Sequence, residues 1–132
     1  MAKSKLRILY GEGDNDILEA QAAAMEKAGH TVRIANNGHE VLGAAQQGDY
    51  DLIFMDIQMP DMDGYTATAA IREKERQSGG HIPIVAMTAH AMQGDAEKCI
   101  SAGMDGYVSK PIDRAKLFAV IAEVTGAVGQ PV

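Results

Sequence analysis

Short apolar runs alternate with longer segments whose apolar residues recur with a helical period, and this pair of patterns repeats five times along the chain. Alternation of this kind predicts a parallel β-sheet covered by helices. Strands are expected over residues 6–10, 31–35, 52–55, 84–87 and 106–108. Helices are expected over residues 16–28, 38–47, 65–77, 94–102 and 114–125. Residues 52–55 are apolar on both faces, which is typical of a central strand.

The predicted elements describe one α/β unit. A length of 132 residues suits a single domain with a substantial core. We expect one domain over residues 1–132, with its core at about 6–125 and tails at 1–5 and 126–132. Right-handed connections between parallel strands place helices on both faces of the sheet, which is a doubly wound architecture.

The charge and cysteine content narrow the possible functions. A formal net charge of -6, without a compensating block of Lys and Arg, argues against direct nucleic-acid binding. Residues 72–76 alternate in sign, which predicts a solvated helix face. A single cysteine, Cys99, excludes an internal disulfide. No apolar run has the length of a membrane span, so we expect no membrane insertion and a cytoplasmic location.

Polar side chains follow four of the predicted strands. In open α/β sheets ligands bind beyond the carboxyl ends of the strands, so these residues are the candidate site. Clustered carboxylates are costly unless a cation neutralises them, and Mg²⁺ prefers such oxygen ligands. An Asp can attack phosphorus, while Lys and Thr can stabilise the transferred oxygens. The residues concerned are Glu12, Asp14, Asp16, Asp56, Thr88 and Lys110.

Two segments resemble the response-regulator receiver family, and especially the receiver modules of hybrid histidine kinases. Residues 52–64 read LIFMDIQMPDMDG, and residues 84–112 read IVAMTAHAMQGDAEKCISAGMDGYVSKPI. The similarity extends from Leu6 to about Val124. It implies a flavodoxin-like fold with five parallel strands in the order 2-1-3-4-5.

The resemblance also implies roles for individual residues. Asp56 is then the phosphoacceptor, Thr88 the switch hydroxyl and Lys110 the cation that binds the phosphoryl group. Tyr107 is the aromatic switch residue. The implied ligands of Mg²⁺ are Glu12, Asp14, Asp56 and the backbone carbonyl of Gln58.

A receiver implies phosphorelay signalling rather than ordinary enzymatic turnover. Its phosphoryl donor is a sensor histidine kinase or a histidine phosphotransfer protein, and it promotes its own phosphorylation and dephosphorylation. The added charge biases a two-state equilibrium near Thr88, Tyr107 and the fourth helix. The remodelled surface then serves a downstream protein partner.

The sequence departs from the family pattern after the first strand. Two adjacent acids are usual there, whereas Glu12 is followed by Gly13. Two alternatives stay open: a local bulge brings Asp14 inward, or the site binds Mg²⁺ weakly or not at all. The second would make the chain a pseudo-receiver, an interaction module with impaired phosphorylation. A phosphatase is a third reading, but Gln58 stands where such enzymes often have a second Asp.

Several other polar residues have simpler interpretations. Four further acids are expected to be helix caps or solvated loop residues: Asp61, Asp63, Asp95 and Asp113. Gly64 suits the loop after Asp56, because glycine adopts backbone angles that other residues avoid. The four histidines, His30 among them, show no metal-binding spacing, so we interpret them as surface or loop residues.

Overall fold

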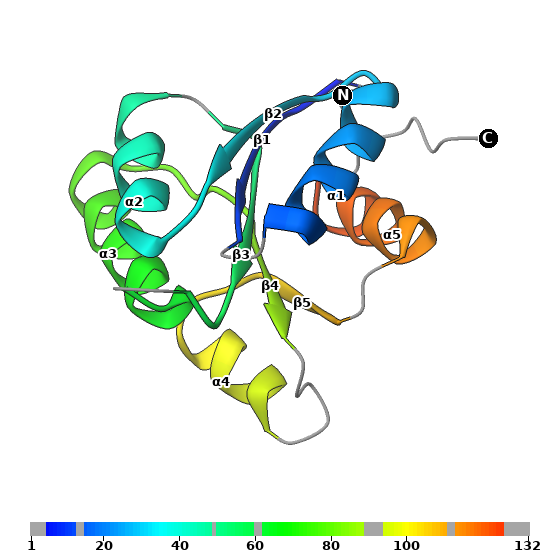
Figure 1. The fold of residues 1–132 in the computed structure, drawn as a ribbon. Coiled ribbons are helices and arrows are strands. Elements are labelled where there is room, and N and C mark those ends of the chain that lie inside the picture. The colour runs from blue at the N-terminus through cyan, green and yellow to red at the C-terminus, as the bar shows by residue number, and fades with distance from the viewer. Residues whose placement is uncertain are drawn as a thin grey trace.

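Five parallel strands form one sheet in the order β2-β1-β3-β4-β5, as the sequence predicts (Figure 1). The computed structural model describes residues 5–12, 15–48, 50–59, 62–88, 94–110 and 113–125. The strands are β1 (Arg7–Gly11), β2 (Thr31–Ala35), β3 (Leu52–Asp56), β4 (Ile84–Thr88) and β5 (Gly106–Ser109). Strand order reverses beside β1, because β1 pairs with β2 on one side and β3 on the other.

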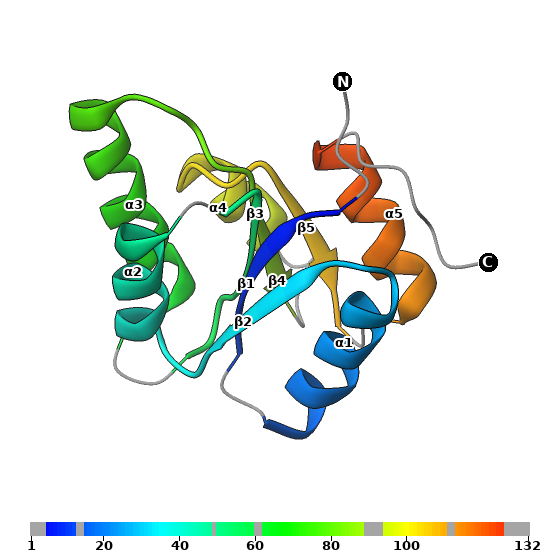
Figure 2. The same cartoon turned by 90° about the horizontal axis from the view of Figure 1, so that it is seen from above.

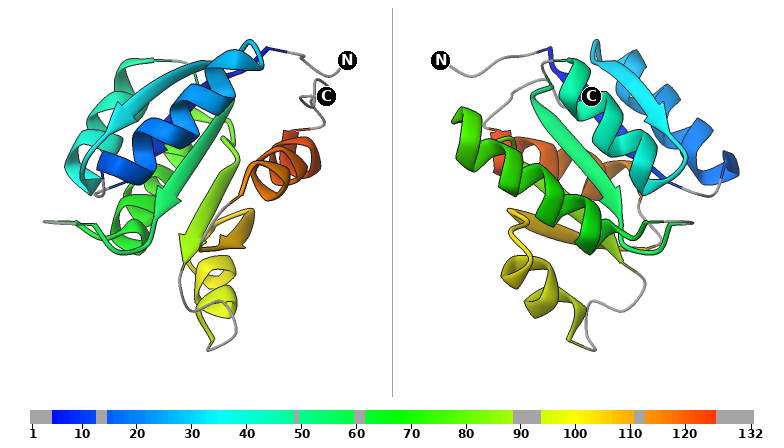
Figure 3. Two further views of the ribbon diagram at one scale, coloured as in Figure 1. Left: turned by 45° about the vertical axis from the view of Figure 1, so that its right-hand side comes forward. Right: turned by 90° about the vertical axis from the view of Figure 1, so that its left-hand side faces the viewer.

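Helices cover both faces of this sheet, which confirms the predicted doubly wound architecture (Figures 2 and 3). One hydrophobic cluster packs α1 and α5 against one face, and a second packs α2, α3 and α4 against the other. The helices are α1 (Asn15–Lys27), α2 (Gly38–Gln47), α3 (Gly64–Ser78), α4 (Asp95–Ser101) and α5 (Arg114–Thr125). Among the helices described, none is long and apolar enough to span a membrane.

The observed boundaries lie within a residue or two of the predicted ones. The strands β3 and β4 each continue one residue further than expected and end on Asp56 and Thr88. These polar residues still take part in the strand ladder, because backbone pairing does not depend on side-chain polarity. The assignment of one domain with a core at 6–125 stays a prediction. Residues 1–4 and the predicted tail at 126–132 lie outside the described residues.

The central strand β3 is buried at all five positions. Such burial on both faces is what a parallel sheet between two helical layers requires. On the α1 and α5 side, the rings of Tyr10 and Phe54 lie with their centroids 5.5 Å apart. The opposite face of β3 packs against α2 and α3 through Ile53 and Met55. The strand is therefore held rigidly, and so is the residue at its end.

Side chains cap the helices that follow the strand ends. Asp63 accepts a hydrogen bond from the Thr66 N–H at 2.8 Å and so caps α3. Asp113 accepts from the backbone N–H three residues further on, also at 2.8 Å. For Asp63 and Asp113, the structure thus selects the cap from the two predicted roles, whereas Asp61 and the side chain of Asp95 lie outside what the structure describes. Asn37 caps α2 and accepts from the Glu40 N–H at 2.9 Å. Each cap satisfies an amide that the helix itself leaves without a partner.

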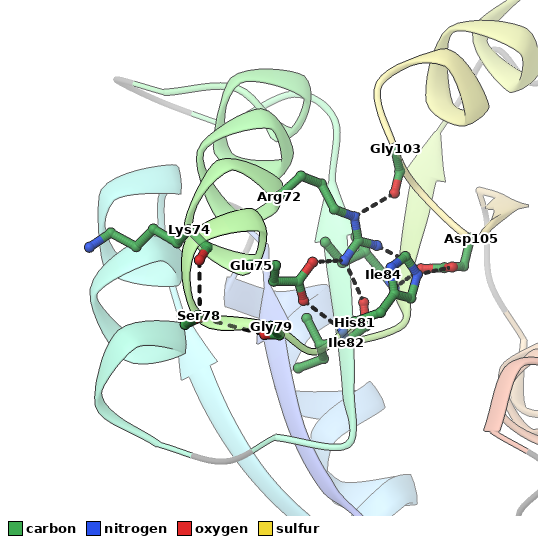
Figure 4. A network of polar contacts seen from close by, with 10 residues as sticks. All are labelled: Arg72, Lys74, Glu75, Ser78, Gly79, His81, Ile82, Ile84, Gly103 and Asp105. Atoms are coloured by element: carbon green, nitrogen blue, oxygen red, sulfur yellow. Dashed lines mark hydrogen bonds and ion pairs between the residues drawn. The ribbon is translucent and has the colours of Figure 1, made fainter.

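An arginine on α3 organises the edge of the sheet where β4 and β5 begin (Figure 4). Arg72 donates from Nε to the carbonyl of Gly103 at 2.8 Å and from Nη1 to the carbonyl of Ile82 at 2.9 Å. It also forms ion pairs with Glu75 at 2.6 Å and with Asp105 at 2.8 Å. A single side chain thus joins α3 to the segments that lead into two strands.

Asp105 extends this network to its neighbours. One of its oxygens accepts from the Ile84 N–H at 2.8 Å, and the other lies 2.6 Å from Nε2 of His81. The prediction of a solvated face is therefore wrong for Arg72, whose side chain is only 11% exposed. It holds for Arg76, which is 73% exposed and forms an exposed ion pair with Glu73 in the same helix. Backbone carbonyls from distant segments draw Arg72 inward.

Replacing Arg72 by Met should lower the free energy of unfolding by about 2 to 3 kcal/mol, because buried carbonyls and carboxylates lose their donor. Arg76→Met is the matched control, since it removes an exposed pair worth at most about 1 kcal/mol. Urea denaturation of both variants measures the difference. Equal midpoints for the two would contradict the anchoring role of Arg72.

His30 is predicted to be a surface or loop residue, and it is a loop residue that is buried rather than at the surface. It is 5% exposed and lies in the loop before β2. Its Nδ1 accepts a hydrogen bond from the Leu6 N–H at 3.0 Å, and its ring stacks on Phe118. Burial lowers the pKa of His30 below its ordinary value of 6.5. A proton on Nδ1 would also abolish the hydrogen bond to Leu6.

Stability should therefore fall as the pH drops below 6.5, because the unfolded chain binds a proton that the folded His30 resists. The contribution is fully present above that pH and is lost as the pH falls toward the lowered pKa. We expect His30→Asn, whose side-chain oxygen can accept from the same N–H, to reduce this loss. Urea midpoints at about pH 7.5 and pH 5.5 test this, since other titrations are common to both proteins. An equal loss in both would refute it.

Candidate functional site

The carboxyl ends of four strands bring the candidate residues to one edge of the sheet. Glu12 follows β1, Asp56 ends β3, Thr88 ends β4 and Lys110 follows β5. Hydrogen bonds of the backbone continue past the strand ends: the Glu12 N–H donates to the carbonyl of Ala35 at 3.0 Å, and the Lys110 N–H donates to that of Thr88 at 2.8 Å. The pairing of the strands therefore fixes the backbone positions from which these side chains extend.

Lys110 joins the two carboxylates. Its Nζ lies 2.9 Å from Oδ2 of Asp56 and 3.2 Å from Oε1 of Glu12. Both acids are buried, with exposed fractions of 5% and 1%, while the lysine side chain keeps 23% exposed. The predicted convergence of Glu12, Asp56 and Lys110 is thus present in the structure. The ammonium group offsets the cost of burying two like charges together.

The ionisation of these groups is coupled. Burial raises the pKa of the Glu12 carboxyl, and the adjacent Asp56 carboxylate raises it further, while Lys110 opposes both effects. Burial alone would lower the pKa of Lys110, but contacts with Asp56 and Glu12 outweigh it and raise that pKa. The lysine therefore stays charged, and Glu12 is the group that resists ionisation.

The loop after Asp56 is shaped by close backbone contacts. The Gln58 N–H donates to Oδ1 of Asp56 at 3.0 Å, and the Gly64 N–H donates to the carbonyl of Ile57 at 2.9 Å. A Cβ atom on Gly64 would lie 2.6 Å from the carbonyl oxygen of Asp56. The first turn of α3 therefore rests directly on the residue that carries the candidate acceptor, and only glycine fits there.

The remaining predicted site residues differ in how far they are buried. Thr88 is 3% exposed and pairs in register with Ser109 of β5. Tyr107 lies on β5 with 46% of its surface exposed. Gln58 is exposed, next to Asp56. Asp14 and Gly13 lie outside the described residues, so the alternatives about the second acid stay open.

The acidic residues at this edge fit a hard divalent cation. The second oxygen of Glu12, Oε2, is buried and has no hydrogen-bond partner among the described residues. An oxygen in that situation is open to a cation, whose positive charge would favour the ionised form of a carboxyl that otherwise resists ionisation. Within the described part of the chain, no three acidic, His or Cys side chains gather as a complete metal cluster. Mg²⁺ needs fewer, because one or two carboxylates commonly hold it together with waters and phosphate oxygens.

One buried group beside the site is not among the residues that the sequence pattern singles out. The hydroxyl of Tyr10 is buried and lacks a hydrogen-bond partner among the residues described, and the Tyr10 side chain is fully buried. Burial raises the pKa of its phenol, and the carboxylates of Glu12 and Asp56 raise it further. A tyrosine in a strand resembles any core aromatic in sequence. Its position two residues before Glu12 is the only signal that could have drawn attention to it.

An Asp, a Thr and a Lys thus lie at the carboxyl ends of three neighbouring strands of a doubly wound sheet. The chain belongs to the response regulator receiver domain family, whose family model matches residues 8–122. Receivers of this family serve phosphorelay signalling in hybrid histidine kinases and response regulators. The family and fold predicted from the sequence are confirmed.

Curated relatives include large sensor kinases. The chain is 48% identical over 120 residues to "Hybrid signal transduction histidine kinase I" of Dictyostelium discoideum, which covers 87% of this chain and 7% of that protein. It is 43% identical over 103 residues to "Sensor histidine kinase GacS" of Pseudomonas protegens, covering 77% of this chain and 11% of that protein. The chain thus spans only a small part of these relatives.

Solved structures resemble the whole fold. The receiver domain of a sensor histidine kinase from Pseudomonas aeruginosa, with magnesium coordinated in its active site cleft, superposes with a TM-score of 0.83 at 35% identity. The alignment covers 93% of this chain and 99% of that one. The receiver domain of Ssk1 from Saccharomyces cerevisiae, crystallised with the histidine phosphotransfer protein Ypd1, gives a TM-score of 0.90 at 28% identity. That alignment covers 96% of this chain and 92% of the other.

Gly64→Ala should destabilise the fold by about 1 to 3 kcal/mol, because the new methyl group must displace the backbone of Asp56. Gly43→Ala, inside α2, is the control: no atom of the described chain lies within 4 Å of its Cβ position. That control should gain about 0.5 to 1 kcal/mol from improved helix propensity. Urea denaturation measures both. A loss at Gly43 or none at Gly64 would contradict the packing described here.

Proposed function

We propose that this receiver accepts a phosphoryl group on Asp56 from a phosphohistidine on a sensor histidine kinase or a phosphotransfer protein. The observation that carries the proposal is the contact of Lys110 with Asp56, at 2.9 Å, in a buried acidic pocket. The ammonium group of Lys110 is placed where it can bind the negatively charged oxygens of a phosphoryl group on Asp56. The Gln58 N–H orients the carboxylate from the other side.

The transfer is an in-line displacement at phosphorus. A carboxylate oxygen of Asp56 forms a bond to phosphorus while the bond from phosphorus to the imidazole nitrogen breaks. The electron pair of that bond stays with the imidazole, and the product is a mixed anhydride of Asp56. No proton has to leave the Asp56 carboxylate, because it reacts as the anion.

Lys110 and Thr88 stabilise the transferred group. The ammonium of Lys110 contacts two carboxylates and can offer the same charge to phosphoryl oxygens, since its side chain reaches the pocket from the end of β5. Thr88 ends β4, which pairs directly with β3, and its hydroxyl supplies a neutral hydrogen bond. Charge and positioning account for most of the catalysis in such transfers.

Glu12, Asp56 and the backbone carbonyl of Gln58 are proposed to hold Mg²⁺. The ion supplies positive charge that neutralises the phosphoryl oxygens and lowers the repulsion between donor and acceptor. The pairing of two buried carboxyl groups with a single ammonium group supports this role, because the ionised site keeps one negative charge that a cation can balance. Asp14 is proposed as a further ligand, in place of the acid that Gly13 replaces.

Phosphorylation is proposed to switch a protein-binding surface. Movement of Thr88 toward the phosphoryl group frees space beside β4, and Tyr107, now largely exposed on β5, turns into that space. Such a change favours one of two pre-existing states rather than creating a new one. The altered surface around α4 and β5 then binds a downstream partner.

A single, reduced cysteine supports a cytoplasmic setting for this relay.

Incubation with acetyl phosphate should give a single phosphoryl adduct in the intact mass, and only when Mg²⁺ is present. Asp56→Asn should give none, because the amide is not nucleophilic. Asp63→Asn is the matched control, since Asn caps α3 as well as Asp does and the acceptor is untouched. That variant should be phosphorylated as the unmodified chain is.

The outcomes separate the candidate functions. An adduct that survives Asp56→Asn would place the acceptor elsewhere and overturn the assignment. No adduct from acetyl phosphate or from a phosphohistidine donor would identify a pseudo-receiver instead. Continuous release of phosphate from a small phosphoester would identify a phosphatase.

A further inference from the structure

Two buried polar atoms near the pocket lack partners, and they are chemically complementary. Within the described residues, the hydroxyl of Tyr10 has no acceptor and Oε2 of Glu12 has no donor. Both residues are buried almost completely, at 0% and 1% exposed. A phenol donates and a carboxylate accepts, so one hydrogen bond would satisfy both atoms at once.

The strand geometry puts the two side chains on the same side of the sheet. Side chains along a strand alternate between faces, so residues two apart point the same way, about 6.6 Å apart. The extended course of β1 continues through Glu12, whose N–H still pairs with the carbonyl of Ala35. Tyr10 therefore lies one layer below Glu12, and a side chain that leans along the strand spans that distance.

The neighbouring strand repeats the arrangement. Tyr10 pairs in register with Phe54 of β3, and their rings are in contact with centroids 5.5 Å apart. Asp56 follows Phe54 by two residues and so lies one layer above it on the same face. The Tyr10 ring is thus held by packing directly below the acidic pocket. The influence of Glu12 and Asp56 on the pKa of its phenol agrees with this closeness.

We propose that Tyr10 is a positioning residue of the magnesium site, which donates a hydrogen bond to Glu12, directly or through one water, when the ion draws that carboxylate from Lys110. This inference rests on the proposed function, because it assumes that Glu12 is a metal ligand. A carboxylate that binds a metal is commonly oriented by a hydrogen bond to its other oxygen. The packed phenol supplies that bond without loss of side-chain freedom.

The test is Tyr10→Phe, which removes the hydroxyl and keeps the ring. We expect the dissociation constant for Mg²⁺ to rise about 10-fold, measured by calorimetry and by the shift in unfolding temperature that Mg²⁺ produces. Phosphorylation by acetyl phosphate should slow at low Mg²⁺ and recover at saturating Mg²⁺. The urea midpoint without Mg²⁺ should not fall, because the lost hydroxyl had no partner.

Thr68→Val is the matched control. It removes another fully buried hydroxyl without a partner in the described chain, on α3, and keeps the side-chain shape. Its Mg²⁺ affinity should equal that of the unmodified chain. An equal loss of affinity in both variants, or an unchanged affinity in Tyr10→Phe, would overturn the inference while the proposed function stands. Failure of the unmodified chain to bind Mg²⁺ at all would overturn the magnesium site itself.

A double-mutant cycle tests whether Tyr10 acts through Glu12. Once Glu12→Ala has removed the carboxylate, adding Tyr10→Phe should cause no further loss of Mg²⁺ affinity. Independent, additive losses would show that Tyr10 acts otherwise and would overturn the proposal. A measurement on the unmodified chain adds to this: Mg²⁺ should change its near-ultraviolet tyrosine absorption, and the change should be missing from Tyr10→Phe.

Discussion

The contact of one ammonium group with two buried carboxylates is the interaction on which this site depends. Without Lys110, the acids at the ends of β1 and β3 would face each other in a medium that screens charge poorly. With it, one carboxylate charge is still uncompensated when all three groups are ionised. The pocket is therefore stable enough to form and negative enough to attract a cation. Strand pairing, helix caps and the tight loop at Gly64 all serve to deliver these groups.

Most of the fold could be predicted from the sequence, because hydrophobic periodicity alone separates buried strands from amphipathic helices. The candidate site could be predicted too, since parallel strands end at one edge and the polar residues after them must meet there. The burial of Arg72 and His30 could not, because it depends on backbone groups that distant segments supply to each of them. The burial of the Tyr10 hydroxyl could not be predicted either, because it depends on how the sheet is packed. The role of Asp14 as a ligand of Mg²⁺ stays a prediction.

The molecule uses the two edges of its sheet for different purposes. At the carboxyl edge, charged groups are placed where they can exchange partners when a ligand arrives. At the amino edge, Arg72 and Asp105 bind backbone groups that stay in place. The strands β4 and β5 are thus held at one end and carry Thr88 and Lys110 at the other.

The distance between those edges also bears on how such domains diverge. Substitutions around Arg72 alter how firmly the sheet is anchored without touching the carboxylate that carries the chemistry. Substitutions on the exposed surface of β5 would alter the proposed partner surface without touching that anchor. Natural selection can therefore adjust stability and partner specificity as separate traits. Lineages that share one chemical reaction can then diverge widely in both traits.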